Sequence, residues 1–480
     1  MINIFATLLQ CYSSANLSHN LFEIILTEST QLPTPFSSLE RRAIASLASL
    51  YGFRMLGLFM VLPVLALYQH QYADASPLLL GLTLGAYGLT QALLQIPLGL
   101  LSDRIGRRPV IIGGLLLFIA GSIVAAMADT MLGLMLGRGL QGLGAIASTL
   151  MAMVTDLTSE DKRTVAMASI GASIGLSFIL AMIVGPVVAS SMGLSGIFWL
   201  TALLGMLGIL IFLLFVPNSI QVQRNREALA DINQVGVLLR EPNLMRLNFS
   251  IFVLHLALMA AFVVIPDILA TELGLGADSL WWVYLVLLGG GFVLMVPMMV
   301  IGEKRQQQKF SVCVAVALLA VSSLVLGWQR SLILTPLMLL AFFAAFNLLE
   351  ASLPSWLSKA CPAGSRGTAM GLYSTSQFLG AFAGGVLGGW SLQYFGVDGL
   401  FLVVGVISLV WLLVALRLEA PRPLQTVVLQ IGDRDIEDFA KIISSTKGVE
   451  DILMVEGEPL VYIKVDKRVV DMASLQPYLN

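Results

Sequence analysis

Apolar runs of about twenty residues alternate with short polar segments from residue 44 to residue 416. An α-helix needs about 20 apolar residues to cross the hydrocarbon core of a bilayer. We predict twelve such spans in two sets of six: 44–68, 78–101, 110–128, 131–154, 164–190, 196–216, 244–270, 280–301, 310–327, 332–356, 368–394 and 398–416. The pattern therefore predicts an all-α polytopic membrane protein made of two six-helix bundles.

Changes in composition divide the chain into five parts. They are an irregular lead-in at 1–42, a first bundle at 43–216, a polar linker at 217–243, a second bundle at 244–417 and a C-terminal domain at 424–480. The first apolar run, Ile2–Leu9, has no basic segment ahead of it, so we expect a disordered lead-in rather than a cleaved signal peptide. We expect the linker to be cytoplasmic and partly helical.

The C-terminal domain has the pattern of a small soluble fold. Apolar runs at Thr426–Ile431, Val449–Val455 and Leu460–Val465 predict strands, and the spacing within Asp435–Ser444 and Lys467–Leu475 predicts helices. This β-α-β-β-α order predicts an α+β, ferredoxin-like domain. It contains no cysteine, which excludes a thiolate metal carrier. We expect it to regulate gating, to bind a small ligand or to self-associate through an exposed sheet edge.

The composition supports a membrane protein and excludes other classes. Of the 480 residues, 57% are hydrophobic and 12% are charged, and the mean hydropathy is +0.88. A net charge of −2 leaves no large basic face, so we expect no nucleic-acid partner. Cys11, Cys313 and Cys361 lie far apart, which suggests neither a disulfide framework nor a zinc site. We expect no metal and no cofactor.

Lys and Arg fall almost entirely on one side of the predicted spans. They are Arg41, Arg42, Arg104, Arg107, Arg108, Lys162, Arg163, Arg224, Arg226, Arg240, Lys304, Arg305, Lys309, Lys359, Arg366, Arg417 and Arg422. The connections on the other side carry only Arg330. Because cationic loops resist translocation, this asymmetry predicts a multi-pass protein of the plasma (inner) membrane with both termini in the cytoplasm.

The connection between the second and third spans is dense in charge. Asp103, Arg104, Arg107 and Arg108 lie in a short turn, and Gly106 can adopt a positive φ there at no steric cost. A topology anchor is the simpler interpretation of any basic loop. However, the order Gly99-x-x-x-Asp103-Arg104-x-Gly106-Arg107-Arg108 resembles the loop 2–3 signature of the major facilitator superfamily.

Two other segments are similar to signatures of that superfamily. The segment Arg138–Gly144 resembles the arginine-centred signature of the fourth span, in which a buried arginine is linked to proton coupling. Gly185-Pro186 resembles the antiporter signature of the fifth span. The resemblance implies a secondary transporter that works by alternating access. For the charged loop, we expect Asp103 to dock at a helix terminus of the opposite bundle, near Thr368, and to act in a conformational switch.

The two bundles repeat each other weakly. Pro97 precedes Asp103-Arg104 as Pro297 precedes Glu303-Lys304, 200 residues later. A second match relates Met167 to Met370, 203 residues apart. Such a repeat implies pseudo-symmetric bundles with a pathway at their interface near the midplane.

Few polar side chains fall inside the predicted spans. Arg138 lies in an apolar segment, where insertion scales assign it a cost of about 2.5–3.5 kcal/mol, so it must face protein or water. It is either functional or a structural arginine bonded to carbonyl groups at a broken helix; Arg54 lies nearer the cytoplasmic face and can also snorkel. The other candidates for proton transfer or substrate contact are His255, Glu350, Asn347, Gln91 and Gln95.

Small residues recur every fourth position in the fifth and eleventh spans. They are Ser177, Ala181 and Gly185, next to Pro186, and Gly380, Gly384 and Gly388. This spacing lines one helix face and lets backbones approach closely. We predict that these residues pack the helices together and that this packing helps to seal one half against the other.

The leading interpretation is a proton-coupled secondary transporter that exports small, lipophilic compounds. Its expected partners are a small-molecule substrate, protons and the lipid bilayer. Two alternatives remain: uptake of a small solute, and a membrane sensor that signals through its C-terminal domain. The sequence contains no phosphate-binding Gly-x-x-x-x-Gly-Lys-Ser/Thr loop, nucleophile–base pair or metal cluster, so we do not predict an enzyme.

Overall fold

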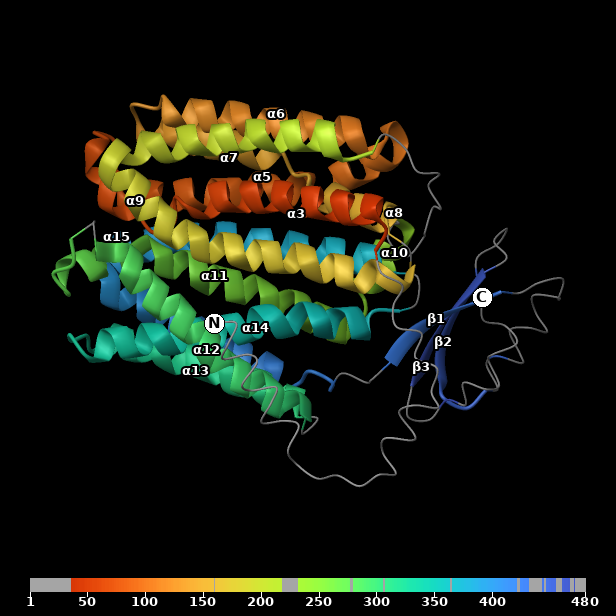
Figure 1. Cartoon of the computed structure of the whole chain (residues 1–480). Helices are drawn as coiled ribbons and strands as arrows, with labels where there is room; N and C mark the ends of the chain where they lie inside the picture. The colour runs from red at the N-terminus through yellow and green to blue at the C-terminus, as the bar shows by residue number, and fades with distance from the viewer. Residues whose placement is uncertain are drawn as a thin grey trace, which may run out of the picture.

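The computed structural model describes residues 36–480 except 159, 218–231, 277–278, 305–306, 363–364, 421–423, 431–442, 444–445, 455–459, 467–469 and 471–480. Helices form most of the described chain before residue 416, and three strands follow (Figure 1). Residues 1–35 of the predicted disordered lead-in and 218–231 of the predicted linker lie outside the described residues. The prediction is wrong for the end of the lead-in, because α3 already begins at Ser38.

The helices of the first half agree closely with the predicted spans. They are α3 (Ser38–Phe59), α4 (Leu65–Tyr68), the 3-10 helix η1 (Gln69–Gln71), α5 (Pro77–Ile105), α6 (Arg107–Ala126), α7 (Met131–Leu143), α8 (Ala147–Asp156) and α9 (Glu160–Phe215). Polar caps fix several starts: Ser37 forms a capping box with Glu40, and Thr130 accepts from the Gly133 amide. Asp74 accepts two more amides at the start of α7.

The second half has the same kind of elements. They are α10 (Ile232–Leu238), α11 (Pro242–Thr271), α12 (Leu280–Lys304), α13 (Gln308–Trp328), α14 (Leu334–Ala360) and α15 (Arg366–Ala415). In the part of the chain that the structure describes, eight helices are long and apolar enough to cross a membrane. The protein is therefore a helical polytopic membrane protein.

The structure differs from the prediction where helices break. The predicted span 44–68 is interrupted between Phe59 and Leu65, because Pro63 cannot donate an amide hydrogen bond to a continuing helix. The predicted span 131–154 is interrupted at 144–146. Conversely, the predicted loops 191–195 and 391–397 are helical apart from one glycine each, Gly193 (φ 68°) and Gly396 (φ 67°), which interrupt α9 and α15.

The two halves contact each other through glycines of α5 and α15. A Cβ at Gly81 would lie 2.0 Å from the carbonyl oxygen of Gly385, and one at Gly389 would lie 2.4 Å from that of Pro77. A Cβ at Gly88 would lie 2.7 Å from the carbonyl oxygen of Phe378. The backbones therefore touch along the Pro77 end of α5, which is the end opposite the charged loop.

The small residues singled out in the sequence pack elsewhere. Gly380, Gly384 and Gly388 lie against α11, where a Cβ at Gly384 would lie 2.2 Å from the Leu256 carbonyl oxygen. A Cβ at Gly185 would lie 2.5 Å from the Met60 carbonyl oxygen, at the break after α3. These contacts confirm the predicted close packing but stay within one half, so a part of these glycines in gating stays a prediction. Across the halves, α15 meets α5 through the neighbouring glycines Gly385 and Gly389, and α9 meets α12.

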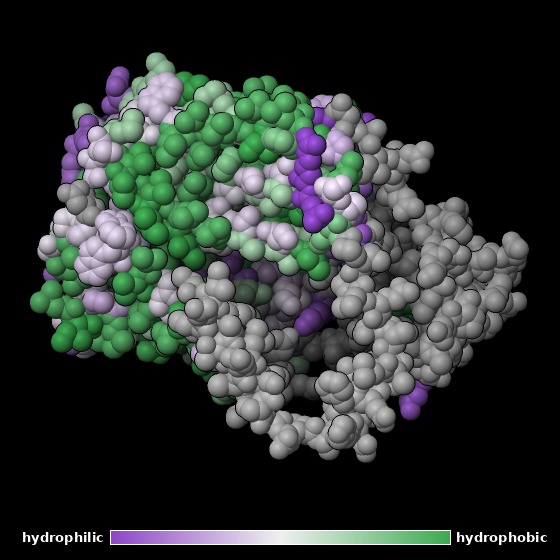
Figure 2. All heavy atoms as spheres, viewed as in Figure 1, coloured by the Kyte–Doolittle hydropathy of each residue, from purple (hydrophilic) through white to green (hydrophobic). Residues whose placement is uncertain are grey.

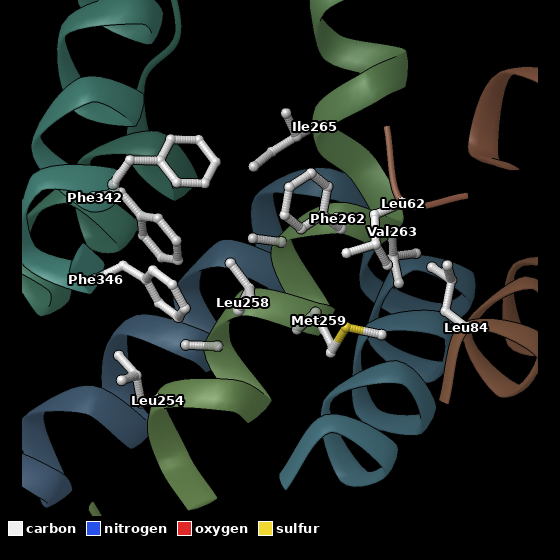
Figure 3. Close-up of a cluster of buried hydrophobic side chains, with 14 of the residues drawn as sticks. Leu62, Leu84, Leu254, Leu258, Met259, Phe262, Val263, Ile265, Phe342 and Phe346 are labelled. Atoms are coloured by element: carbon white, nitrogen blue, oxygen red, sulfur yellow. The ribbon is translucent and has the colours of Figure 1, made fainter. Parts of the chain in front are cut away.

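An apolar cluster surrounds the contact between the halves. Leu62 and Leu84 from the first half lie near Met259 and Val263 of α11, and Phe262 lies on the side toward α14 (Figure 3). All five side chains are buried. The helical surface in view is largely hydrophobic, as lipid contact requires (Figure 2).

The C-terminal part forms a three-stranded antiparallel sheet of order β1-β3-β2. Its strands are β1 (Leu424–Gln430), β2 (Val449–Met454) and β3 (Leu460–Asp466), close to the predicted positions. Placing β3 between β1 and β2 is the order of a split β-α-β unit. The predicted helices at 435–444 and 467–475 lie almost wholly outside the described residues, so the ferredoxin-like domain stays a prediction.

Candidate functional site

The charged loop connects α5 to α6 through Gly106, whose φ of 96° requires glycine. Arg107 organises the loop: it binds Asp103 one turn earlier, donates to Ser102 Oγ at 2.6 Å, and pairs with Asp156 at the end of α8 at 3.2 Å. Arg107 therefore ties the loop to the neighbouring helix of its own half.

The remaining loop residues make fewer contacts. Arg104 is exposed, while the Arg108 guanidinium stacks 5.2 Å from the Phe212 ring centre on α9. A Cβ at Gly99 would lie 3.2 Å from Ser148 Oγ, so α5 lies close to α8 here. Among the described contacts, Asp103 binds Arg107 and not the start of α15 near Thr368. Docking of Asp103 across the halves therefore stays a prediction for another conformation.

A polar cluster inside the first half centres on Arg54 of α3. Its Nη2 donates to Gln91 Oε1 at 2.6 Å and to the Gly144 carbonyl oxygen at 2.9 Å, at the break between α7 and α8. Gln91 continues the chain of hydrogen bonds to Gln95 at 2.9 Å. A carbonyl contact at a broken helix was the structural alternative considered for Arg138, but in the structure Arg54 makes it, and Arg54 is buried rather than snorkelling.

Arg138 of α7 lies in the same cluster. Its guanidinium is 5.3 Å from the centre of the Tyr87 ring, and the guanidinium of Arg54 is 5.8 Å from the same ring centre. Arg138 Nη1 donates to Gln141 Oε1 at 3.1 Å, and Gln141 in turn donates to Ser122. Arg54 is 2% exposed and Arg138 is 0% exposed, so the two cations are withdrawn from lipid and water.

A second polar cluster lies inside the second half. Gln377 of α15 places Nε2 at 2.9 Å from His255 Nε2 and at 3.2 Å from Glu350 Oε1. His255 Nδ1 lies 3.3 Å from the Ile251 carbonyl oxygen, which can only accept, so the neutral ring carries its proton on Nδ1 and accepts at Nε2. His255 and Glu350 are 3.8 Å apart.

Asn347 does not join this hydrogen-bonded group. Its amide nitrogen lies 3.3 Å from the position of a Cβ at Gly291, which places it at the contact between α12 and α14.

Tyr87 and Gln377 are among the members of these clusters that sequence reasoning missed. Tyr87 lies one helical turn before Gln91, and Gln377 lies one turn before Gly380. Both positions follow from 3.6-residue periodicity once a polar neighbour is recognised. The halves also touch here, because the Tyr87 and Phe378 ring centres are 6.3 Å apart.

A separate charge cluster closes the second half at the end away from the loop. Arg330, after α13, donates to Glu272 at the end of α11 at 2.7 Å and also binds Asp398 of α15. Partial burial opposes its charge, but the bonds from Glu272 and Asp398 raise the pKa of Arg330 above its usual value. This cluster fastens helix ends and has no group in common with the two internal clusters.

Comparisons with known proteins agree with this architecture. The sequence profile of the Major Facilitator Superfamily matches residues 47–385 and 247–449. The chain is 43% identical over 441 residues to the inner membrane transport protein YajR of Escherichia coli strain K12, covering 91% of this chain and 97% of YajR. It is 27% identical over 372 residues to the multidrug resistance protein MdtH of Aeromonas salmonicida, covering 75% and 91%.

Solved structures show the same fold. A bacterial homologue of the human lysosomal transporter Spinster, in an inward-facing and occupied conformation, matches with a TM-score of 0.64 at 14% identity, covering 80% of this chain and 98% of that one. The human organic anion transporter MFSD10 matches with a TM-score of 0.58 at 20% identity, covering 78% and 99%. The extent and identity of these matches place the chain in the major facilitator superfamily, a family of membrane transporters and not of enzymes.

Proposed function

We propose that this protein is an inner-membrane secondary transporter that exports small, lipophilic compounds in exchange for protons. The observation that carries the proposal is the cluster of His255, Gln377 and Glu350 inside the helical bundle. A carboxylate and an imidazole at membrane depth are costly, and they mark proton pathways in transporters. Gln377 connects the two groups through hydrogen-bond distances to both.

Two resemblances support export. Gly185-Pro186 is similar to the antiporter signature, and one relative is named as a multidrug resistance protein. The similarity to the inner membrane transport protein YajR supports an inner-membrane location. The Lys and Arg pattern supports twelve spans with both termini in the cytoplasm.

Alternating access requires the halves to separate at one end while they meet at the other. In this conformation they meet at the Pro77 end of α5, through Gly81, Gly385 and Gly389, while Asp103 pairs within its own half. In the opposite conformation Asp103 docks at the start of α15, where a helix N-terminus favours a carboxylate by about 0.3–1 kcal/mol, or about 2 kcal/mol when partly buried. The charged loop then biases the equilibrium between the two states.

The test uses inside-out vesicles with an imposed pH gradient that is followed by a pH-sensitive dye. A panel of lipophilic anions, cations and neutral compounds is added to vesicles that contain the wild type, Glu350→Gln, or the matched control Glu241→Gln. Glu241 is exposed just before α11. Compound-dependent collapse of the gradient is expected in the wild type and the control, and its loss in Glu350→Gln.

Other outcomes identify the alternatives. Accumulation of a compound without proton movement would favour uptake or uniport over proton antiport. If no compound has an effect and deletion of residues 420–480 abolishes the phenotype of the intact protein, the sensor interpretation replaces transport.

A further inference from the structure

We propose that Arg54 and Arg138 form a binding site for the anionic group of the substrate, which is an organic carboxylate with an apolar, aromatic body. This inference rests on the proposed transport function and names its substrate class. It follows from buried hydrogen-bond donors that have no acceptor.

Five buried polar atoms of this cluster make no hydrogen bond in the described chain. They are Nε and Nη1 of Arg54, Nε and Nη2 of Arg138, and the Tyr87 hydroxyl. Four of them can only donate, and the phenol can also donate. Buried donors normally find a partner, because each one left without a partner costs about 1–3 kcal/mol. An oxyanion can accept hydrogen bonds from several such donors at once.

The charge balance leads to the same conclusion. Arg54 and Arg138 bring two positive charges to one cluster, and their direct side-chain partners are the neutral amides Gln91 and Gln141. No Asp or Glu pairs with either arginine within the described residues. Buried charges are normally paired, and a water molecule would satisfy donors without supplying a negative charge. The second half, in contrast, holds a carboxylate of its own.

The arginines are held in position for binding. Gln91 and the Gly144 carbonyl oxygen fix one side of Arg54. Thr90 Oγ1 donates to the Gly139 carbonyl oxygen at 2.8 Å, which fastens α5 to α7 beside Arg138. A planar guanidinium that is already oriented can bind a carboxylate through two parallel hydrogen bonds with little further loss of entropy.

The surroundings define the rest of the ligand. The Tyr87 ring lies beside both guanidiniums, Phe118 lies 5.9 Å from Arg54, and Phe378 brings a ring from the opposite half. Aromatic walls favour an apolar, planar body next to the anionic group. Because Tyr87 and Phe378 belong to different halves, a ligand at this point touches the interface that must open and close. Cationic compounds are disfavoured by the two guanidiniums.

The test compares three compounds that share one ring system: 1-naphthoate, 1-naphthylmethylamine and 1-naphthalenemethanol. The full chain is purified, and its melting temperature is read with a thiol-reactive dye, since Cys361 is buried at 1% exposure. We expect the carboxylate to raise the melting temperature of the wild type by about 3 °C or more at saturation, and the amine and the alcohol to raise it by less than about 1 °C.

Variants locate the site. Arg54→Gln and Arg138→Gln are each expected to remove the shift caused by 1-naphthoate, while Arg54→Lys keeps a smaller shift because it keeps the charge. Arg240→Gln is the matched control, since Arg240 is exposed outside the spans, and it keeps the full shift. The proposal is overturned if no compound shifts the wild type, if the amine or the alcohol matches the carboxylate, or if folded Arg→Gln variants keep the shift. The comparison of the three compounds on the wild type tests the proposal even where a variant does not fold.

The outcome is separable from that of the proposed function. Binding of 1-naphthoate at the arginines without collapse of the pH gradient would uphold this site and reject proton-coupled export. Proton-coupled export of cations or neutral compounds, without binding of 1-naphthoate, would do the reverse.

Discussion

The polar clusters of the two halves differ in the chemistry that they carry. In the first half, the guanidinium groups of Arg54 and Arg138 lie beside Tyr87. In the second half, His255 and Glu350 are both titratable and are joined by Gln377. Under the two proposals above, the first half holds the ligand and the second moves the proton. The glycine contact between α5 and α15 joins the two halves in this conformation.

The largest expected effect separates these two roles. Glu350→Gln should abolish proton-driven accumulation of substrate while it preserves exchange of labelled for unlabelled substrate across the membrane, because exchange needs no change in protonation. Arg138→Gln should reduce both activities by about tenfold or more, as expected when a charged hydrogen bond worth about 1.5–3 kcal/mol is lost. Proton-driven accumulation and exchange are both measured in proteoliposomes. Equal loss of exchange in the two variants would contradict the division of roles.

The next prediction concerns the contact that joins the halves. Gly81→Ala places a Cβ 2.0 Å from the Gly385 carbonyl oxygen, and such overpacking costs about 1–3 kcal/mol. The protein should remain folded but populate the closed Pro77 end about 5-fold to 100-fold less, because the contact exists only in that conformation. Gly113→Ala is the matched control, since a Cβ there meets nothing within 4 Å.

This shift can be measured through the labelling rate of a cysteine introduced at Leu62. That residue is 2% exposed in the closed arrangement (Figure 3). The labelling rate should rise in Gly81→Ala and stay at the parental value in Gly113→Ala. An unchanged rate in both would mean that the glycines do not limit closure.

A smaller effect is expected from the charged loop. Asp103→Asn removes the acidic partner of Arg107 and the carboxylate that is expected to dock on α15, so transport should fall severalfold, in line with a dipole contribution of about 0.3–2 kcal/mol. The rate of transport in vesicles provides the measurement. The loop in the second half lacks the glycine, having Gln306 where the first has Gly106, so Glu303→Gln is the comparison and should change the rate less. Unchanged transport in Asp103→Asn would reject the switch.

Sequence patterns predicted the helical part of this molecule well, because lipid imposes a length and a periodicity on every span. They also identified the charged residues inside the spans, Arg54, Arg138 and Glu350, since such residues are costly in a membrane and therefore conspicuous. Partners were harder to predict: Gln377 and Tyr87 are ordinary residue types until the fold brings them beside an ionisable group. The spacing of Gly380, Gly384 and Gly388 predicted close packing but not the neighbour, because spacing shows that one face of α15 is small and not which helix it meets. The glycines that meet across the halves carry the same signal in the sequence, because Gly81 and Gly85, and Gly385 and Gly389, are spaced by four residues.

The smallest expected effect tests a purely structural ion pair at the start of the first half. Glu40 accepts from the Ser37 amide at 2.8 Å and from Lys162 at 3.1 Å. Although burial opposes it, these bonds lower the pKa of Glu40 from 4.5 to about 2. Because the folded pKa lies below that of the unfolded chain, the stabilisation is complete above about pH 4.5 and is lost as the pH falls toward 2.

Glu40→Gln should therefore lower the melting temperature at pH 7, by an amount equivalent to about 0.5–1 kcal/mol, and the difference from the wild type should shrink below pH 4.5. Glu241→Gln, at an exposed position, should leave the melting temperature unchanged at both pH values. A difference that grew on acidification would contradict the assigned direction of the pKa shift.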